Sequence, residues 1–158
     1  REIERDETHF KPMIDMDMVS VNHEITAQLA RSAVRASTNL PVKYVVLDTK
    51  TGRTGRYLAA FRGRKTVMAV CYRLHAQRIL ALSYGVVPIL RTQELSDKYH
   101  FLVDALEFID QYRKLQDDDL MAIVGGSFGP DGGASYLELA DVRGIRRRNE
   151  MIAAQNKR

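Results

Sequence analysis

The sequence predicts an α/β fold, a three-layer α/β/α domain around a doubly wound, mostly parallel five-stranded sheet. Four short apolar runs carry this prediction, because their interiors are continuously apolar, as in strands covered on both faces. They lie at 43–48, 67–71, 86–90 and 120–124. The segments between them are long enough for the helical crossovers that parallel strands require. A chain of 158 residues is expected to form one domain with short appended segments.

A helix is expected before the first strand and within each crossover. Residues 21–38 are amphipathic, and Ser20 precedes them as a plausible N-cap. The apolar face of this helix is expected to consist of Ile25, Leu29, Ala33 and Val34. The crossover helices are predicted at 53–61, 73–83 and 98–114, the last from apolar residues at helical spacing.

A fifth strand is predicted at 135–140, where polar and apolar residues partly alternate as at a sheet edge with one wet face. Only the ten residues GGSFGPDGGA separate it from the fourth run. They are too few and too rich in Gly and Pro to hold a helix, so this strand should run antiparallel after a hairpin. A doubly wound chain starts near the middle of its sheet, which places the fourth strand beside the first.

The net charge of +4 belongs to the C-terminal segment, because residues 1–143 contain equal numbers of basic and acidic side chains. A neutral body without an aromatic-basic face argues against nucleic-acid binding through Arg146–Arg148. No apolar stretch is long enough for a membrane span, and the charged N-terminal residues do not resemble a secretory signal. The single cysteine, Cys71, excludes an internal disulfide framework, so a cytoplasmic location is expected.

The turn after the first predicted strand is the strongest candidate for a ligand site, because ligands of open α/β sheets bind at the carboxyl ends of strands. Its residues are Thr49, Lys50, Thr51, Gly52, Arg53 and Thr54. Free helix N-terminal amides and the helix dipole favour an anion there, and no acidic residue lies between Lys50 and Lys65. We therefore predict a phosphate site, with the Thr49 and Arg53 side chains pointing into the crevice. The alternative is an ordinary helix start with solvated basic residues.

A second candidate is the glycine-rich hairpin that follows the fourth strand. By itself such a segment is only a connection, but the predicted topology makes it face the first turn where the strand order reverses. The hairpin residues expected to contact a ligand are Gly126, Ser127, Gly129 and Gly132.

The remaining candidates are weaker. Cys71 and His75 would be the reactive pair of an alternative function, a stand-alone phosphosugar-binding enzyme, although a buried apolar thiol is more common. The four histidines lack metal-ligand spacing, so no metal site is expected. The acidic run 117–119 lies at the sheet edge opposite the crevice and is interpreted as a solvated turn. We assign no catalytic residue, because the crevice residues include no acid/base pair.

The same residues resemble the C-terminal domain of the pyruvate kinase family. Residues 46–62, VLDTKTGRTGRYLAAFR, are similar to the family's first strand and effector loop, and residues 66–90 to its next two strands. The segment GGSFGPDGGASYLEL resembles the second effector loop and last strand. The opening REIERDETHF is similar to the end of a helix in the preceding catalytic barrel. Residues 1–18 are thus expected to be a barrel remnant, 19–142 the domain, and 143–158 a basic extension.

This resemblance implies a regulatory domain with strand order 3-2-1-4-5 that binds a phosphorylated effector through both loops. In the whole glycolytic enzyme a TIM barrel transfers phosphate from phosphoenolpyruvate to ADP, using magnesium and often potassium. The barrel motifs are absent here, so the chain alone is expected to be non-catalytic and without a cofactor, with its own barrel as a partner. Members that respond to fructose 1,6-bisphosphate carry a Trp-Arg pair where this chain has Ser127-Phe128. A sugar or nucleotide monophosphate is therefore the expected effector.

The predicted edge strand 135–140 also suggests self-association, because unpaired backbone groups at a sheet edge can pair with another chain. The resemblance implies the same, since the family's last strand lies at a subunit interface. We expect two copies to pair antiparallel about a two-fold axis. The alternative is that residues 144–158 fold back as a short helix and cover the edge.

Overall fold

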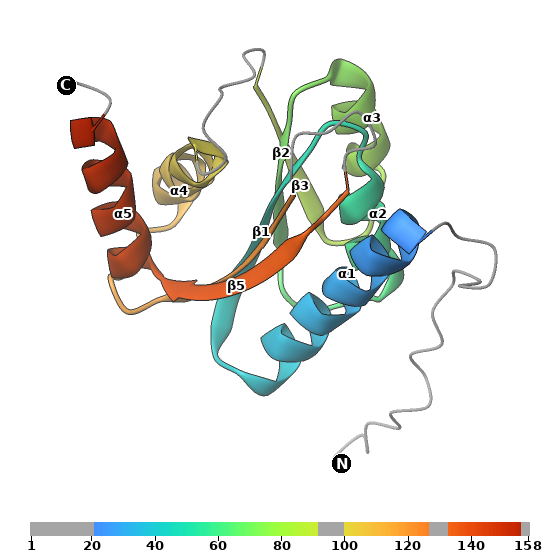
Figure 1. Cartoon of the computed structure of the whole chain (residues 1–158), viewed down its shortest axis with the longest axis horizontal. Helices are drawn as coiled ribbons and strands as arrows, with labels where there is room; N and C mark the ends of the chain where they lie inside the picture. The colour runs from blue at the N-terminus through green and yellow to red at the C-terminus, as the bar shows by residue number, and fades with distance from the viewer. Residues whose placement is uncertain (1–20, 92–99, 127–132, 156–158) are drawn as a thin grey trace.

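The computed structural model describes residues 21–91, 100–126 and 133–155, and it shows a central sheet between two layers of helices (Figure 1). The sheet order is β3-β2-β1-β4-β5, which confirms the predicted fold class. The strands are β1 (Val42–Thr49), β2 (Val67–Cys71), β3 (Val86–Leu90), β4 (Leu120–Gly125) and β5 (Tyr136–Asp141).

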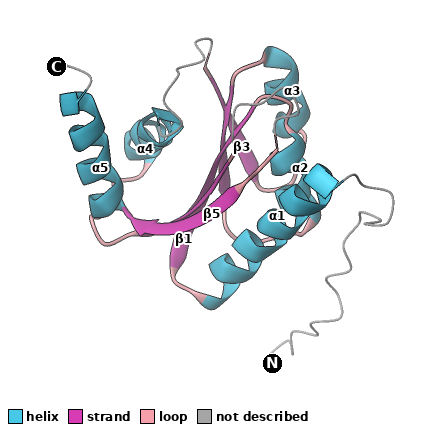
Figure 2. Ribbon diagram, viewed as in Figure 1, coloured by secondary structure: helices cyan, strands magenta, loops and turns pink. Residues whose placement is uncertain are grey.

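The helices divide between the two faces of the sheet (Figure 2). They are α1 (Val21–Asn39), α2 (Arg53–Ala60), α3 (Leu74–Ala81), α4 (His100–Tyr112) and α5 (Val142–Gln155). The first three cover one face, and α4 and α5 cover the other. This division follows from the crossovers, since the chain changes faces when it returns from the β3 edge to the far side of β1.

The central position of β1 fixes the place of everything attached to its carboxyl end. It pairs in parallel with β2 on one side and with β4 on the other, so Leu47 lies opposite both Ala69 and Val124. The last pair, β4 and β5, is antiparallel, with Gly125 opposite Tyr136. The turn after β1 and the hairpin after β4 therefore leave the sheet at the same edge.

Each face of the sheet has its own hydrophobic core, and successive residues of β1 supply both. Val45 and Leu47 pack beneath α1, α2 and α3, whereas Val46 packs beneath α4 and α5. All three side chains are buried, as expected for a strand covered on both faces.

The buried face of α1 differs from the expectation. Ile25 is exposed, Leu29 and Val34 are partly buried, and of the four predicted residues only Ala33 is fully buried. The side chains that do face the protein are small: Thr26, Ala27, Ala30, Ala33 and Ser37. Small side chains allow α1 to lie close to α2 and the sheet, so hydrophobicity alone selected the wrong face. The proposed cap, Ser20, lies outside the described residues.

The basic C-terminal segment is a helix over residues 142–155 rather than an extension without a core of its own. Val142 and Ile145 are fully buried in the same core as α4. The helix lies on the α4 face, and within the described residues β5 remains an edge strand paired with β4 alone. The helical alternative is thus correct for the fold of this segment, but the helix packs on a sheet face.

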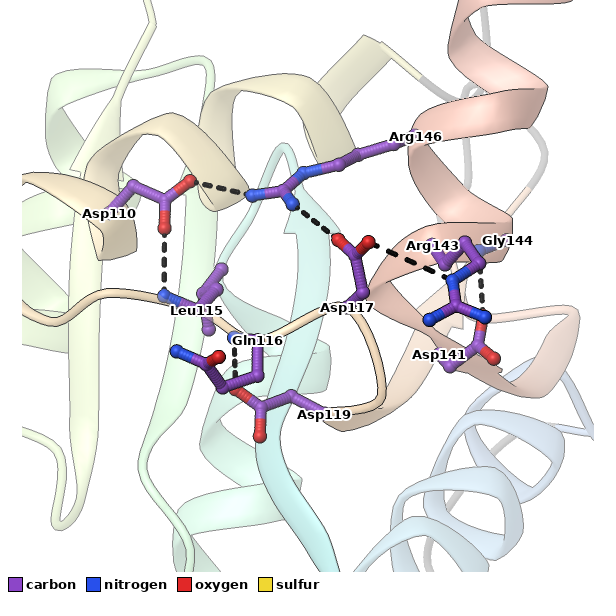
Figure 3. Close-up of polar contacts among 9 residues, drawn as sticks. All are labelled: Asp110, Leu115, Gln116, Asp117, Asp119, Asp141, Arg143, Gly144 and Arg146. Atoms are coloured by element: carbon purple, nitrogen blue, oxygen red, sulfur yellow. Dashed lines mark hydrogen bonds and ion pairs between the residues drawn. The ribbon is translucent and has the colours of Figure 1, made fainter.

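Acidic residues of neighbouring segments pair with the arginines of α5. Arg146 reaches between Asp110 and Asp117, with N–O distances of 3.1 and 2.8 Å (Figure 3). Asp119 is also structural, because it accepts hydrogen bonds from Lys43 Nζ and from the Gln116 amide, each at 2.8 Å. The interpretation of 117–119 as a merely solvated turn is therefore wrong for Asp117 and Asp119, whose carboxylates join segments distant in sequence.

Candidate functional site

The turn after β1 is built around Gly52, which caps α2. Its φ of 82° lies in the left-handed region that glycine adopts without strain. The Gly52 amide donates to Thr49 Oγ1 at 2.9 Å, and the Arg53 amide donates to Thr51 Oγ1 at 3.4 Å. The hydroxyls and the glycine thus fold the chain sharply from the central strand into α2.

The side chains of the turn differ in exposure, and one expectation is wrong. Thr49 is buried, and its hydroxyl accepts a bond within the turn instead of pointing into the crevice. Thr54 is buried as well, whereas Thr51 is exposed and Lys50 and Arg53 are half-buried. The side chains that can reach a ligand are therefore those of Lys50, Thr51 and Arg53.

Asp48, just before the turn, is a residue that the sequence analysis did not single out. Burial raises the pKa of its carboxyl to about 7, although Lys50 and the backbone amides of Asp48 and Gly126 act in the opposite direction. The carboxyl thus changes charge near neutral pH beside the predicted anion site. The sequence signal that could have identified Asp48 is its position as an acidic residue at the end of an otherwise apolar run.

The interaction between Asp48 and the Gly126 amide brings the start of the second loop beside the first turn. Gly126 also has no room for a Cβ, because the carbonyl oxygen of Gly133 fills that position. The two chain segments that connect the hairpin to the sheet therefore lie very close together at Gly126 and Gly133. The other predicted loop residues, Ser127, Gly129 and Gly132, lie outside the described residues.

A pocket of about 260 Å³ adjoins the turn. It is lined by His23, Arg53, Arg56 and Tyr57. Arg53 and Arg56 belong to the basic run noted in the sequence, but His23 comes from α1, and no motif in the sequence connects it with α2. The site at the carboxyl end of β1 thus extends toward the space between α1 and α2.

A larger pocket of about 360 Å³ lies elsewhere, between α4 and the amino ends of the first three strands. Its walls are mostly apolar and aromatic: Tyr44, Thr66, Met68, Val87, Phe108, Ile109, Tyr112 and Arg113. Parallel strands place their amino ends at the edge opposite the turn. This pocket is therefore separate from the candidate site.

The alternative reactive pair does not have the properties that catalysis requires. Cys71 is fully buried, and burial raises the pKa of its thiol to about 12, so the reactive thiolate is suppressed at neutral pH. His75 is exposed on α3. Cys71 Sγ instead donates to the Ala69 carbonyl at 3.4 Å, as expected of a structural thiol.

Comparison with known proteins identifies the family of the domain. A family model described as pyruvate kinase, alpha/beta domain, matches residues 27–140, well over half of the chain. The chain belongs to this family. The resemblance noted from the turn and the strands around it is thereby confirmed. The matched region of this pyruvate kinase domain contains β1 to β4 and all of β5 except Asp141, and it ends just before α5.

Individual pyruvate kinases are similar over most of the chain. The protein from Lactobacillus delbrueckii subsp. bulgaricus is 28% identical over 116 residues, which cover 73% of this chain and 20% of that protein. The protein from Borreliella burgdorferi is 25% identical over 139 residues, 86% of this chain and 29% of that protein. The protein from Bacillus licheniformis is 25% identical over 156 residues, 92% of this chain and 26% of that protein. The chain therefore spans less than a third of the length of these relatives.

Two further features of the described residues bear on function. None of the helices in this part of the chain is long and apolar enough to cross a bilayer. Its His, Cys, Asp and Glu side chains form no group of three that could hold a metal ion.

Proposed function

We propose that this chain is the regulatory domain of a pyruvate kinase and that it binds a phosphorylated effector at the turn after β1. The observation that carries the proposal is a glycine-capped helix start with basic side chains at the carboxyl end of the central strand. Gly52 directs the chain so that α2 begins there, and helix N-terminal amides attract anions. Lys50 and Arg53 add positive charge, and Thr51 adds an exposed hydroxyl.

The second loop would complete the site. Gly126 starts that loop beside Asp48, so a ligand at the turn is close to both segments. A negatively charged ligand disfavours ionised Asp48, and bound phosphate therefore favours its protonated form. The proposed effector is a sugar or nucleotide monophosphate, since Ser127-Phe128 provides no cationic residue in the second loop.

The whole protein would be a cytoplasmic, glycolytic kinase that transfers phosphate from phosphoenolpyruvate to ADP. Its relatives are pyruvate kinases several times longer than this chain. The catalytic barrel of that enzyme would hold the magnesium and potassium ions used in phosphoryl transfer. Residues 1–18 would connect the two domains.

The domain would also contribute to subunit assembly through β5. In the described part of the chain this strand has β4 as its partner on one side only, and Leu139 on it is exposed. An apolar edge of this kind favours antiparallel pairing with a second copy.

Ligand-dependent stabilisation tests the effector proposal. A ligand that binds only the folded state raises the unfolding temperature once its concentration exceeds the dissociation constant. We expect glucose 6-phosphate, AMP or a related monophosphate to stabilise the chain. Arg53→Ala should abolish most of that shift, whereas Arg78→Ala, which removes an exposed arginine from α3, should retain it. A panel of monophosphates without any shift would contradict the proposal.

A further inference from the structure

We propose that the pocket between α1 and α2 is a second anion subsite, which binds a phosphate or carboxylate group through His23, Arg53 and Arg56. The inference rests on the proposed function, because Arg53 belongs both to the turn after β1 and to the pocket wall. Apart from Arg53, its residues lie outside both loops that the sequence singles out. It enlarges the ligand that this domain can hold.

Helix geometry places the cationic groups on one wall. Arg53 and Arg56 are three residues apart on α2, so their side chains lie on the same face about one turn apart. Tyr57, the next residue, is buried, and its ring contributes to the pocket lining. His23 comes from the first turn of α1 and lies across the pocket from another helix. Two helices therefore contribute to one cavity.

Arg56 adds a positive charge to the pocket that no described carboxylate pairs with. No ion pair within residues 21–91, 100–126 and 133–155 involves His23 or Arg56. Glu24 is the nearest acidic residue in sequence to the pocket, and it is exposed. A guanidinium has five N–H donors in a planar fork that matches a carboxylate or phosphate. An oxyanion is thus the ligand chemistry that this lining fits.

The size of the pocket agrees with a polyatomic group. Its volume is about 260 Å³, whereas a cavity for one water needs only roughly 10–15 Å³. A phosphoryl or carboxylate group with its adjoining carbon atoms fits this space. The bound group could be the second acidic group of an effector whose first acidic group binds at the turn, in which case Arg53 lies between the two groups. Alternatively, it could belong to a separate anion.

Nuclear magnetic resonance can observe the two subsites independently. The Gly52 amide reports on the turn, the His23 imidazole reports on the pocket, and the exposed His75 on α3 serves as an internal control. On titration of the 158-residue chain with inorganic phosphate, we expect saturable shifts at Gly52 and His23 but not at His75. Arg56→Ala should weaken binding measured at His23 by roughly tenfold, the loss expected for one charge-assisted hydrogen bond.

A matched variant separates local contact from net charge. Arg64→Ala removes an exposed arginine from the same basic run and should leave the His23 titration unchanged. Fructose 1,6-bisphosphate and glucose 6-phosphate then distinguish the sources of the anion. If both acids belong to one ligand, the bisphosphate binds more tightly and Arg56→Ala removes its advantage. If the anion is separate, inorganic phosphate still shifts His23 when the chain is saturated with glucose 6-phosphate.

The outcomes also separate this inference from the proposed function. A shift at Gly52 without one at His23 would overturn the subsite and leave the effector turn intact. An Arg56-dependent shift at His23 alone would support the subsite and contradict binding at the turn. The absence of chemical-shift changes at both Gly52 and His23 would overturn both proposals.

Discussion

Arg146 Nη1 lies 2.8 Å from Asp117 Oδ1, and this contact joins the last helix to the turn before β4. The second guanidinium nitrogen bonds to Asp110 on α4, so one arginine connects three segments. Arg148 makes a further ion pair, at 2.7 Å, with Glu138 on β5. Two of the arginines that stand out in the C-terminal sequence, Arg146 and Arg148, therefore pair with carboxylates of the domain.

The stability of the α5 attachment should depend more on apolar burial than on these ion pairs. Ile145 is fully buried, whereas Arg146 and Asp117 are 40% and 51% exposed. Ile145→Ala should lower the free energy of unfolding by about 2–4 kcal/mol, and Arg146→Ala by less than about 1 kcal/mol. Urea denaturation of both variants measures the difference. Equal losses would show that the ion pairs dominate.

The hydroxyl of Thr49 should be important for the turn rather than for direct ligand contact. Thr49→Val keeps the shape of the side chain but removes the acceptor of the Gly52 amide. We expect a loss of about 1–3 kcal/mol in the free energy of unfolding, the cost of a buried unpaired donor. Thr49→Ser, which retains the acceptor, should be close to the wild type. If Val and Ser behave alike in urea denaturation, the bond is unimportant.

Asp48 should make the stability of the domain depend on pH. Its folded pKa, about 7, lies above the ordinary value of 3.8, so between these values the folded state holds a proton that the unfolded state has lost. The contribution of Asp48 is therefore most favourable at low pH and declines as the pH rises to about 7. Asp48→Asn should remove this decline.

Unfolding measured across the same pH range, with Asp118→Asn as the exposed control, tests the assignment. The Asp118 variant should keep the wild-type slope. An unchanged slope in Asp48→Asn would show that this carboxyl titrates normally.

Self-association through β5 should be sensitive to charge on its exposed surface. Leu139 is 41% exposed on the edge strand, whereas Leu82, after α3, is 92% exposed and far from β5 in the sheet order. We expect the chain to sediment as a dimer, Leu139→Lys to shift it toward monomer, and Leu82→Lys to leave it unchanged. A monomeric wild-type chain at high concentration would exclude the pairing.

The sequence alone predicted the strands of the sheet correctly, because each strand is a compact apolar run bounded by turn residues. The structure moves the predicted strand ends by no more than one residue, as at 43–48, which becomes Val42–Thr49. The α1 face was harder, because alanine and serine can occupy either a buried or an exposed position. The large apolar side chain of Ile25 favoured a face that points to solvent in the structure. The buried face consists of small side chains instead, because α2 approaches α1 closely.

The sequence predicted where the candidate site lies but not how its side chains are arranged. Strand order and the helix start located the turn, since both follow from local pattern. The orientation of Thr49 depends on a hydrogen bond to Gly52, and the approach of His23 to Arg56 depends on how α1 packs on α2. The ion pairs of α5 likewise involve carboxylates such as Asp117, whose distance in sequence from Arg146 hides the pairing.

The place of β1 between β2 and β4 has a consequence for the order in which the chain folds. Lys43 and Asp119, which join β1 to the segment before β4, are 76 residues apart in sequence. During synthesis β1, β2 and β3 emerge first and can pair through local crossovers, whereas β4 closes a long loop and is expected to add slowly. Until it does, the apolar strand β1 presents an open edge, which is a template for pairing with other nascent chains. Aggregation during expression should therefore be most sensitive to changes in β4 and in the segment that delivers it.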